Sequence, residues 1–285
     1  MMQALGNLPA HCSSMVGAGF VGSGSWCPPS CKVLVHFFYS DRNEPDRLVV
    51  PAELHRSLGA IRRGLGATCA VNTTVWARST ILQFLNERDP ELGRLYSRIS
   101  PKFPALLADI ARVTLMHRFG GIYHDVSYRF SDASSLCTML CVLQQYSAVF
   151  ETHPIELRMR NTNMAASQPG LRIFEDCLLV MKQKLASAIA RYERGEMPLA
   201  ESASTLYDIG SRSIIQLVTG NSTLRLQHHE DLIHGVEVRY RSELLRIMRW
   251  PGLRWDRAFK QRVNNANGSA GEVAHWSKLQ AALFV

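Results

Sequence analysis

The stretch "RFGGIYHDVSYRF", residues 118–130, decides how this chain folds. Gly120 and Gly121 end a helical pattern and open an apolar, aromatic run that is typical of a strand and delivers one carboxylate, Asp125. Glycine accepts the positive φ that ends many helices, and without a Cβ it lets another group approach the backbone closely. We therefore expect a helix, a glycine turn that clears space for a ligand of Asp125, and a strand that carries Asp125 to its end. The carboxyl ends of strands are where α/β folds place their chemistry.

The helix before the glycines, "PALLADIARVTLMHRF", carries two different stripes. Leu106, Ile110 and Val113 recur at the spacing of a buried face, while Asp109 and Arg112 project side by side on another face. An ordinary surface ion pair at this spacing stabilises an isolated helix by only about 0.2–0.5 kcal/mol. A functional role for the Asp109–Arg112 pair is favoured because its helix leads directly into the glycine turn.

Side chains alternate along a strand, so the expected strand points Tyr123, Asp125 and Ser127 to one face. His124 and Val126 then point to the other face. A carboxylate and a hydroxyl would thus meet the same ligand.

The chain alternates strand and helix patterns on both sides of this stretch, which predicts an α/β fold. Before the stretch, strands are expected at "CKVLVHFFYS" and "TCAVNTTVW", and helices at "PAELHRSLGAIRRGLG", where Gly66 is placed as a terminator, at "STILQFLNERDPELGRLYSRIS", broken near Pro90, and from Pro104. Residues 1–30 are rich in Gly, Ser and Pro and are expected to be a flexible leader, which leaves residues 31–285 as a single domain.

Composition excludes several classes of protein. The 285 residues are 46% hydrophobic and carry no run near the roughly 18–20 apolar residues of a membrane span, nor a secretory signal, which predicts a soluble protein. Seven cysteines in no paired metal-binding spacing favour reduced thiols in a cytosol, with Cys137 and Cys141 on a helix packed in the core.

The net charge of +8 favours an anionic partner, such as nucleotide phosphates or an acidic membrane surface. Residues 239–262 hold eight basic and two acidic side chains, interleaved with Trp250 and Trp255. This run is either a phosphate-binding or stacking surface or, as is more usual, a helix pair with solvated charges. No nucleic-acid-binding module accompanies it, so a nucleic-acid partner is not expected.

An ordered series of segments from Val33 to Phe130 resembles the glycosyltransferase family 32 group and the related bacterial toxin glucosyltransferases. The series is "VLVHFFYS", the pair Val75–Trp76, "FLNERDPEL" and "ADIARVTLMHRFGGIYHDVS". The last segment is similar to that family's aspartate, arginine, Gly-Gly-x-Tyr-x-Asp-x-Asp signature. Shorter likenesses follow in "NTNMAASQPGLRIFEDCL", "YDIGSRSIIQLVTG" and "AHWSKL".

The resemblance implies a GT-A-type, Rossmann-like mixed sheet flanked by helices, with a helical C-terminal part. It also implies transfer of a sugar from a nucleotide-sugar donor, a UDP-sugar by this likeness, to a glycan or protein acceptor with retention of configuration. Asp109, Arg112 and Asp125 would be the catalytic residues. Donor-binding residues carried over by the likeness are Phe37, Phe38, Tyr39, Trp76, Gly120, Gly121, Tyr123 and Asn163, with Asn161 beside them.

The implied chemistry needs a divalent cation, Mn²⁺ or Mg²⁺, to neutralise the departing diphosphate. Asp125 supplies one carboxylate, but position 127 holds serine where the family has a second acid. Three interpretations are open. Ser127 coordinates through its hydroxyl; Asp132 or His275 helps to hold the metal; or the metal site has decayed and the protein binds without catalysing.

The alternative functions belong to other classes. A glycoside hydrolase needs two acids across the scissile bond, and Arg112 beside Asp109 disfavours a protonated acid there. A degenerate binding protein for nucleotide sugars or glycans is the stronger rival. The absence of a signal fits either a cytoplasmic enzyme of polysaccharide synthesis or an effector secreted into a host cell without a cleaved signal peptide.

Overall fold

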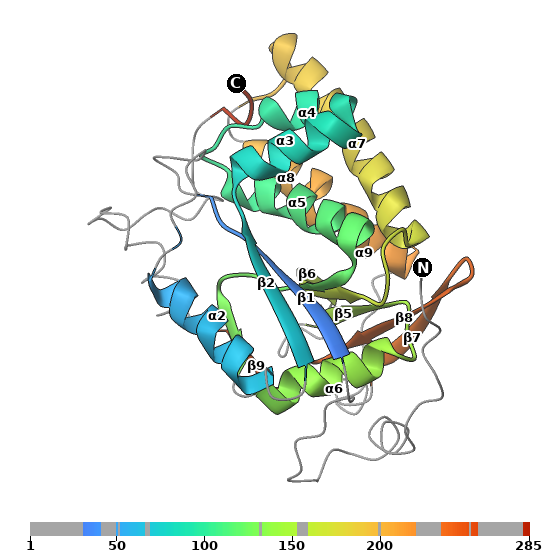
Figure 1. The fold of residues 1–285 in the computed structure, drawn as a ribbon. Coiled ribbons are helices and arrows are strands. Elements are labelled where there is room, and N and C mark those ends of the chain that lie inside the picture. Colours follow the sequence, from blue (N-terminus) through green and yellow to red (C-terminus); the bar gives the residue numbers. More distant parts are fainter. Residues whose placement is uncertain are drawn as a thin grey trace.

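The structure is a computed structural model (Figure 1). It describes residues 31–40, 50, 52–65, 69–130, 133–152, 159–198, 201–220, 235–250, 252–255 and 282–285. The expected leader, the helix terminator Gly66, and both Asp132 and His275 lie outside these residues.

A seven-stranded mixed sheet organises the described residues, in the order β2-β1-β3-β6-β5-β8-β7. Its strands are β1 (Cys31–Phe38), β2 (Cys69–Trp76), β3 (Gly121–Tyr123), β5 (Ala148–Thr152), β6 (Met159–Ala166), β7 (Val236–Tyr240) and β8 (Glu243–Met248). The strands β2, β1 and β3 are parallel, while β6 runs antiparallel to both of its neighbours. A separate pair is formed by β4 (Tyr128–Phe130) and β9 (Leu253–Trp255).

Helices cover both faces of the sheet (Figure 1). One face packs on α2 (Ala52–Leu65) and α6 (Ala133–Leu143), in a buried cluster that includes Val33, Val35 and Phe37. On the other face lie α3 (Arg78–Arg88), α4 (Pro90–Ser97), α5 (Pro104–Phe119), α7 (Arg172–Glu193), α8 (Ser202–Ile209) and α9 (Ser211–Thr219). The mixed α/β sheet flanked by helices is therefore confirmed.

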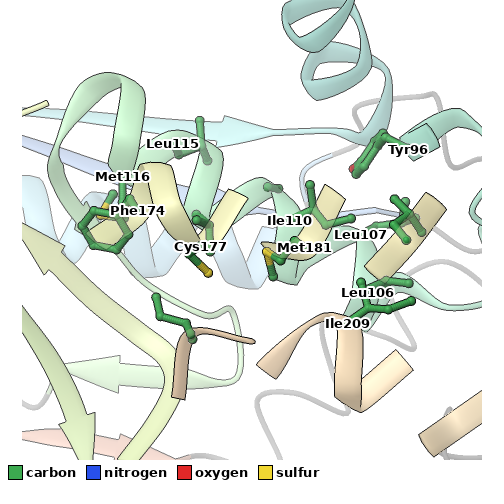
Figure 2. Packing of buried hydrophobic residues seen from close by; sticks show 14 of the residues in the cluster. Tyr96, Leu106, Leu107, Ile110, Leu115, Met116, Phe174, Cys177, Met181 and Ile209 are labelled. Carbon is green, nitrogen blue, oxygen red and sulfur yellow. The ribbon is translucent and has the colours of Figure 1, made fainter. Parts of the chain in front are cut away.

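Helix α5 lies in the middle of the larger core. Its expected apolar stripe, Leu106, Ile110 and Val113, is buried almost completely. Leu106 and Ile110 lie close to residues of α7 and α8, among them Met181 and Ile209 (Figure 2). The helix is thus largely enclosed as far as Met116, and a polar side chain buried on this part of it must find partners inside the protein.

The two glycines after α5 fit tightly against the protein's own backbone. Gly120 and Gly121 have φ of +64° and +81°. A Cβ on Gly121 would lie 2.5 Å from the carbonyl oxygen of Leu34 on β1, and one on Gly120 would lie 2.9 Å from the backbone of Gln168. The close approach that these glycines permit is therefore between segments of this chain, not to a ligand.

Two secondary-structure expectations are wrong. The strand after the glycines ends at Tyr123, because the chain turns at residues 126–127 and then starts β4 in the other sheet. The basic run does not form a helix pair over its described part. Instead β7, β8 and β9 form there, and partly buried and exposed side chains alternate along β7, the last strand of the sheet. The helical section of the second half is α7 to α9, which precedes these strands.

The expectation of reduced thiols is also contradicted at two positions. Cys69 opens β2 and Cys137 lies in α6, and both are disulfide-bonded. Both belong to the core cluster between α2, α6 and the sheet, so packing rather than sequence spacing places them. Cys141 and Cys177 are buried, as expected for small apolar core residues.

Across the residues that the structure describes, no helix combines the length and the apolarity needed to span a membrane. The C-terminal residues 282–285 pack on the larger core. There Leu283 and Phe284 are buried, and the Ser100 N–H donates to the Leu283 carbonyl oxygen at 2.8 Å.

A carboxylate from the sheet stabilises the start of α7. Glu243 on β8 is 7% exposed, and its two oxygens accept from the N–H groups of Arg172 and Ile173 at 2.5 and 3.1 Å. The first N–H groups of a helix lack partners within the helix, and negative charge is favourable there. Glu243 therefore links the sheet to α7.

We predict that Gly121→Ala lowers the free energy of unfolding by about 3 kcal/mol, since left-handed strain and a steric clash add. Gly170→Ala is the matched control. Gly170 has φ of +77°, but nothing lies within 4 Å of a Cβ placed there. Gly170→Ala should lower the free energy of unfolding only by the left-handed backbone strain, about 1–2 kcal/mol. Urea unfolding measures both, and equal losses would show that the clash with Leu34 is absent.

Glu243→Ala should lower the free energy of unfolding by about 1–2 kcal/mol, because two N–H groups at the start of α7, that of Ile173 being buried, lose their acceptor. The control is Glu175→Ala, which removes an exposed acid from the first turn of the same helix. That change should cost at most about 0.5 kcal/mol. If thermal unfolding gives the two variants the same melting temperature, Glu243 does not act as a cap.

Candidate functional site

A tight turn just beyond the carboxyl end of β3 presents Asp125. The carboxylate oxygen Oδ1 accepts from the backbone N–H of Ser127 at 2.9 Å and from its hydroxyl at 2.5 Å. The side chain of Asp125 thus closes its own turn, as aspartate often does. Ser127 is buried, whereas the Asp125 side chain is 21% exposed. Asp125 and Ser127 were expected to share a strand face toward a ligand; instead they lie beyond the end of β3 and bond to each other within a turn.

Arg112 brings the two predicted carboxylates together. Its Nη2 lies 3.0 Å from Asp109 Oδ1 and 4.0 Å from Asp125 Oδ2. The guanidinium also lies over the ring of Tyr123, 5.2 Å from the ring centroid, and its Nε donates to the Ala108 carbonyl oxygen at 3.2 Å. The predicted group of Asp109, Arg112, Tyr123 and Asp125 is therefore assembled around one cation.

Asp109 is anchored by residues far along the chain. A Cβ on Gly210 would lie 2.1 Å from Asp109 Oδ2, and the Ser211 hydroxyl donates to the same oxygen at 3.3 Å. The turn between α8 and α9 therefore encloses Asp109, which is 4% exposed. The segment "YDIGSRSIIQLVTG" contains this turn, and glycine is required there because only hydrogen fits against the carboxylate.

The site is electrostatically polarised. Burial alone would lower the pKa of Arg112, but the charges of Asp109 and Asp125 outweigh burial and raise it above its ordinary value. Burial raises the pKa of the Tyr123 hydroxyl. Arg112 is thus a permanent cation and Tyr123 a neutral phenol at physiological pH. Asp109 and Arg112 are nearly inaccessible, so Asp125 is the exposed member of the group.

A second group of polar residues lies behind the Asp125 turn. Asn163 on β6 is fully buried, and its Oδ1 accepts from the N–H of Asp125 at 3.0 Å. The same oxygen lies 2.9 Å from Nδ1 of His124, and Asn163 Nδ2 donates to Glu151 Oε2 at 2.7 Å. Asn163 therefore holds the backbone of the turn, and its amide is occupied inside the protein. The side chain of Asn161 lies outside the described residues.

The predicted aromatic residues are mostly core. Phe37, Phe38 and Tyr39 are 1%, 5% and 7% exposed. Trp76 is half-buried at the end of β2, where its Nε1 donates to His36 Nδ1 at 3.2 Å and its ring stacks on Phe119. Among these four predicted aromatics, Trp76 is the least buried.

The oxygen donors in the described part of the site suit a cation held largely by its substrate. Asp125 offers one exposed carboxylate, and the Ser127 hydroxyl is already bonded to it. Within the described ranges, no group of three or more His, Cys, Asp or Glu residues could hold a metal ion. Mg²⁺ sites with one carboxylate and several substrate phosphate oxygens are common, and Asp125 fits that kind of site.

Two buried residues beside the site were not predicted from the sequence. His124 was not expected to have a structural role, and Glu151 was not identified at all. Glu151 lies on β5, a strand that carries no motif, and the sheet order β3-β6-β5 is what brings it near Asp125. No signal in the sequence of β5 could have indicated it.

No protein-family model matches this chain, and no curated protein matches it. Among solved structures, the chain is similar to one titled "PaToxG Glycosyltransferase". The identity is 13%, the match covers 86% of this chain and 89% of that one, and the TM-score is 0.42. Values this low describe a loose similarity of chain path, so the function proposed below depends on the residues of the site.

Proposed function

We propose that the protein is a glycosyltransferase that moves a sugar from a nucleotide-sugar donor, a UDP-sugar in the first instance, to a glycan or protein acceptor. One observation carries the proposal. Arg112 is held between Asp109 and Asp125 at the carboxyl end of β3, where a parallel part of the sheet ends. The sequence resemblance implies this same set of residues.

The degree of exposure of each side chain suggests its role in the site. Asp125, with its exposed carboxylate, faces the donor. Arg112 sits behind it as a fixed positive charge, with Nη2 4.0 Å from Asp125 Oδ2. Asp109 neutralises the rest of that buried charge and fixes the guanidinium plane. Asp125 is therefore the contact residue, and Asp109 and Arg112 act chiefly through it.

A divalent cation, Mn²⁺ or Mg²⁺, would be held by Asp125 together with the phosphate oxygens of the donor. When bound, the cation would neutralise the negative charge that develops on the departing diphosphate. Ser127 would keep Asp125 Oδ1 in place by its two hydrogen bonds. His275 is the remaining candidate ligand from the sequence. The resemblance further implies that the sugar keeps its anomeric configuration.

A binding protein for nucleotide sugars, without catalysis, is the second candidate. Ser127 in place of a second acid favours it, as does the lack of a three-residue cluster of metal ligands in the described part of the chain. This protein would bind the donor without turning it over.

We predict that the wild type releases sugar from a UDP-sugar in the presence of Mn²⁺, and that Asp125→Asn lowers kcat about 100-fold. The reason is that an amide cannot supply the negative charge that faces the donor. Asp176→Asn is the matched control, because Asp176 is also partly buried, 17% exposed, and paired with an arginine, Arg241, away from the site. A panel of UDP-sugars with free UDP as the readout provides the measurement.

The outcomes separate the candidates. Turnover that is lost in Asp125→Asn and kept in Asp176→Asn supports the transferase. Donor binding by calorimetry without turnover in the wild type supports the binding protein. Equal turnover in both variants would remove Asp125 from the site and overturn the proposal.

A further inference from the structure

The turn that presents Asp125 is held at both of its ends from inside the protein. At its start, the N–H of Asp125 donates to Asn163 Oδ1 at 3.0 Å. At its end, Nε2 of His124 lies 3.1 Å from the carbonyl oxygen of Tyr128, and the other ring nitrogen lies 2.9 Å from Asn163 Oδ1. Asn163 and His124 are both completely buried. Asn163 Oδ1 therefore ties the start of the turn to β6, while hydrogen bonds from Ser127 and from the Tyr128 N–H to Asp125 close the turn itself.

The orientation of that amide is fixed by Glu151. Asn163 Nδ2 donates to Glu151 Oε2 at 2.7 Å. If the amide were rotated by 180°, its NH₂ would face the N–H of Asp125 and its oxygen would face a carboxylate oxygen. Both contacts would then lack a matching donor and acceptor. Glu151 thus selects the one orientation in which Asn163 accepts from Asp125.

Burying the carboxylate of Glu151 at this position is unfavourable. Glu151 is 4% exposed, and burial raises its pKa, against the effect of hydrogen bonds from Thr162 and Asn163 and of the nearby charge of Arg160. The hydroxyl of Thr162 donates to the same oxygen, Oε2, at 2.7 Å. A buried carboxylate that makes no specific contact can often be replaced by an apolar residue without loss of stability. Its connections lead to the Asp125 turn.

We infer that Glu151 is a positioning residue, which acts through Asn163 to fix the backbone of the Asp125 turn and thereby to aim the carboxylate that faces the donor. This inference rests on the proposed function where it is tested by turnover, whereas the test by amide hydrogen exchange does not depend on that function. His124 lies between the two ends of the turn; burial lowers its pKa to about 4, so the neutral ring donates to one of the two oxygens it faces, Asn163 Oδ1 or the Tyr128 carbonyl oxygen. The three residues come from β5, β6 and the turn itself, so the sheet order places them.

A reciprocal exchange of donor and acceptor tests the inference. Asn163→Asp puts two carboxylates in contact, and it should lower kcat by about tenfold or more with little change in KM, because a small displacement of a reacting group is costly. Glu151→Gln still offers an oxygen to Asn163 and should lose less than about threefold. The double variant restores a hydrogen bond with its direction reversed, from Gln at 151 to Asp at 163. Its kcat should return to within about threefold of Glu151→Gln.

A purely structural role would give a different pattern. In that case the melting temperature of Asn163→Asp falls while the kcat of the folded protein stays the same. That result, or a double variant no more active than Asn163→Asp, would overturn the inference. Asp176→Asn serves again as the control away from the site.

A measurement on the wild type remains decisive even where Asn163→Asp does not fold or no sugar donor is turned over. Amide hydrogen exchange, followed by NMR, should show the N–H of Asp125 protected close to the level of the buried strands, because its acceptor is fully buried. Exchange as fast as that of an exposed loop would show that Asn163 does not hold the turn. Absence of turnover with a protected Asp125 amide would count against the proposed function alone.

Discussion

The structure around the candidate site depends on one buried cation. Arg112 lies in the middle of a helix that is enclosed by core, where an unpaired charge would be strongly unfavourable. Asp109 compensates it from one side, Asp125 approaches it from the other, and the ring of Tyr123 lies beneath it. Each of these partners is contributed by a different local feature of the chain, and all of them must be in place for α5 to remain buried.

This constraint explains the glycines around the site. Gly121 allows β3 to lie directly against β1, which brings Tyr123 and the Asp125 turn to the level of Arg112 on α5. Gly210 allows the turn between α8 and α9 to close on Asp109. The glycines thus serve the packing of charged groups within the chain, and Asp125 is left as the partly exposed carboxylate of the group.

Local patterns predicted most of the fold and half of the site. Helical spacing was sufficient to place Asp109 beside Arg112, and the Gly-Gly pair correctly marked the end of α5. The turn at Ser127 was missed because an aspartate that bonds two residues ahead competes with strand formation, and periodicity does not reveal this. The strands of the basic run were missed because charge, rather than alternation, dominated the interpretation of residues 239–262.

The rest depends on tertiary contacts that a single sequence does not specify. Glu151 meets Asn163 only because β5 and β6 are neighbours in the sheet, and Gly210 meets Asp109 across a long separation in sequence. The disulfide-bonded state of Cys69 and Cys137 is likewise not specified by the spacing of the cysteines in the sequence.

The most direct test of this account is the free energy of unfolding of Arg112→Met, measured by urea denaturation with and without Asp109→Asn. Removing the cation alone should cost about 3–5 kcal/mol, because Asp109 is left buried and uncompensated. Adding Asp109→Asn should then recover part of the loss. A single variant that loses less than about 1 kcal/mol, or a second substitution that adds its own full cost, would contradict the central place of Arg112.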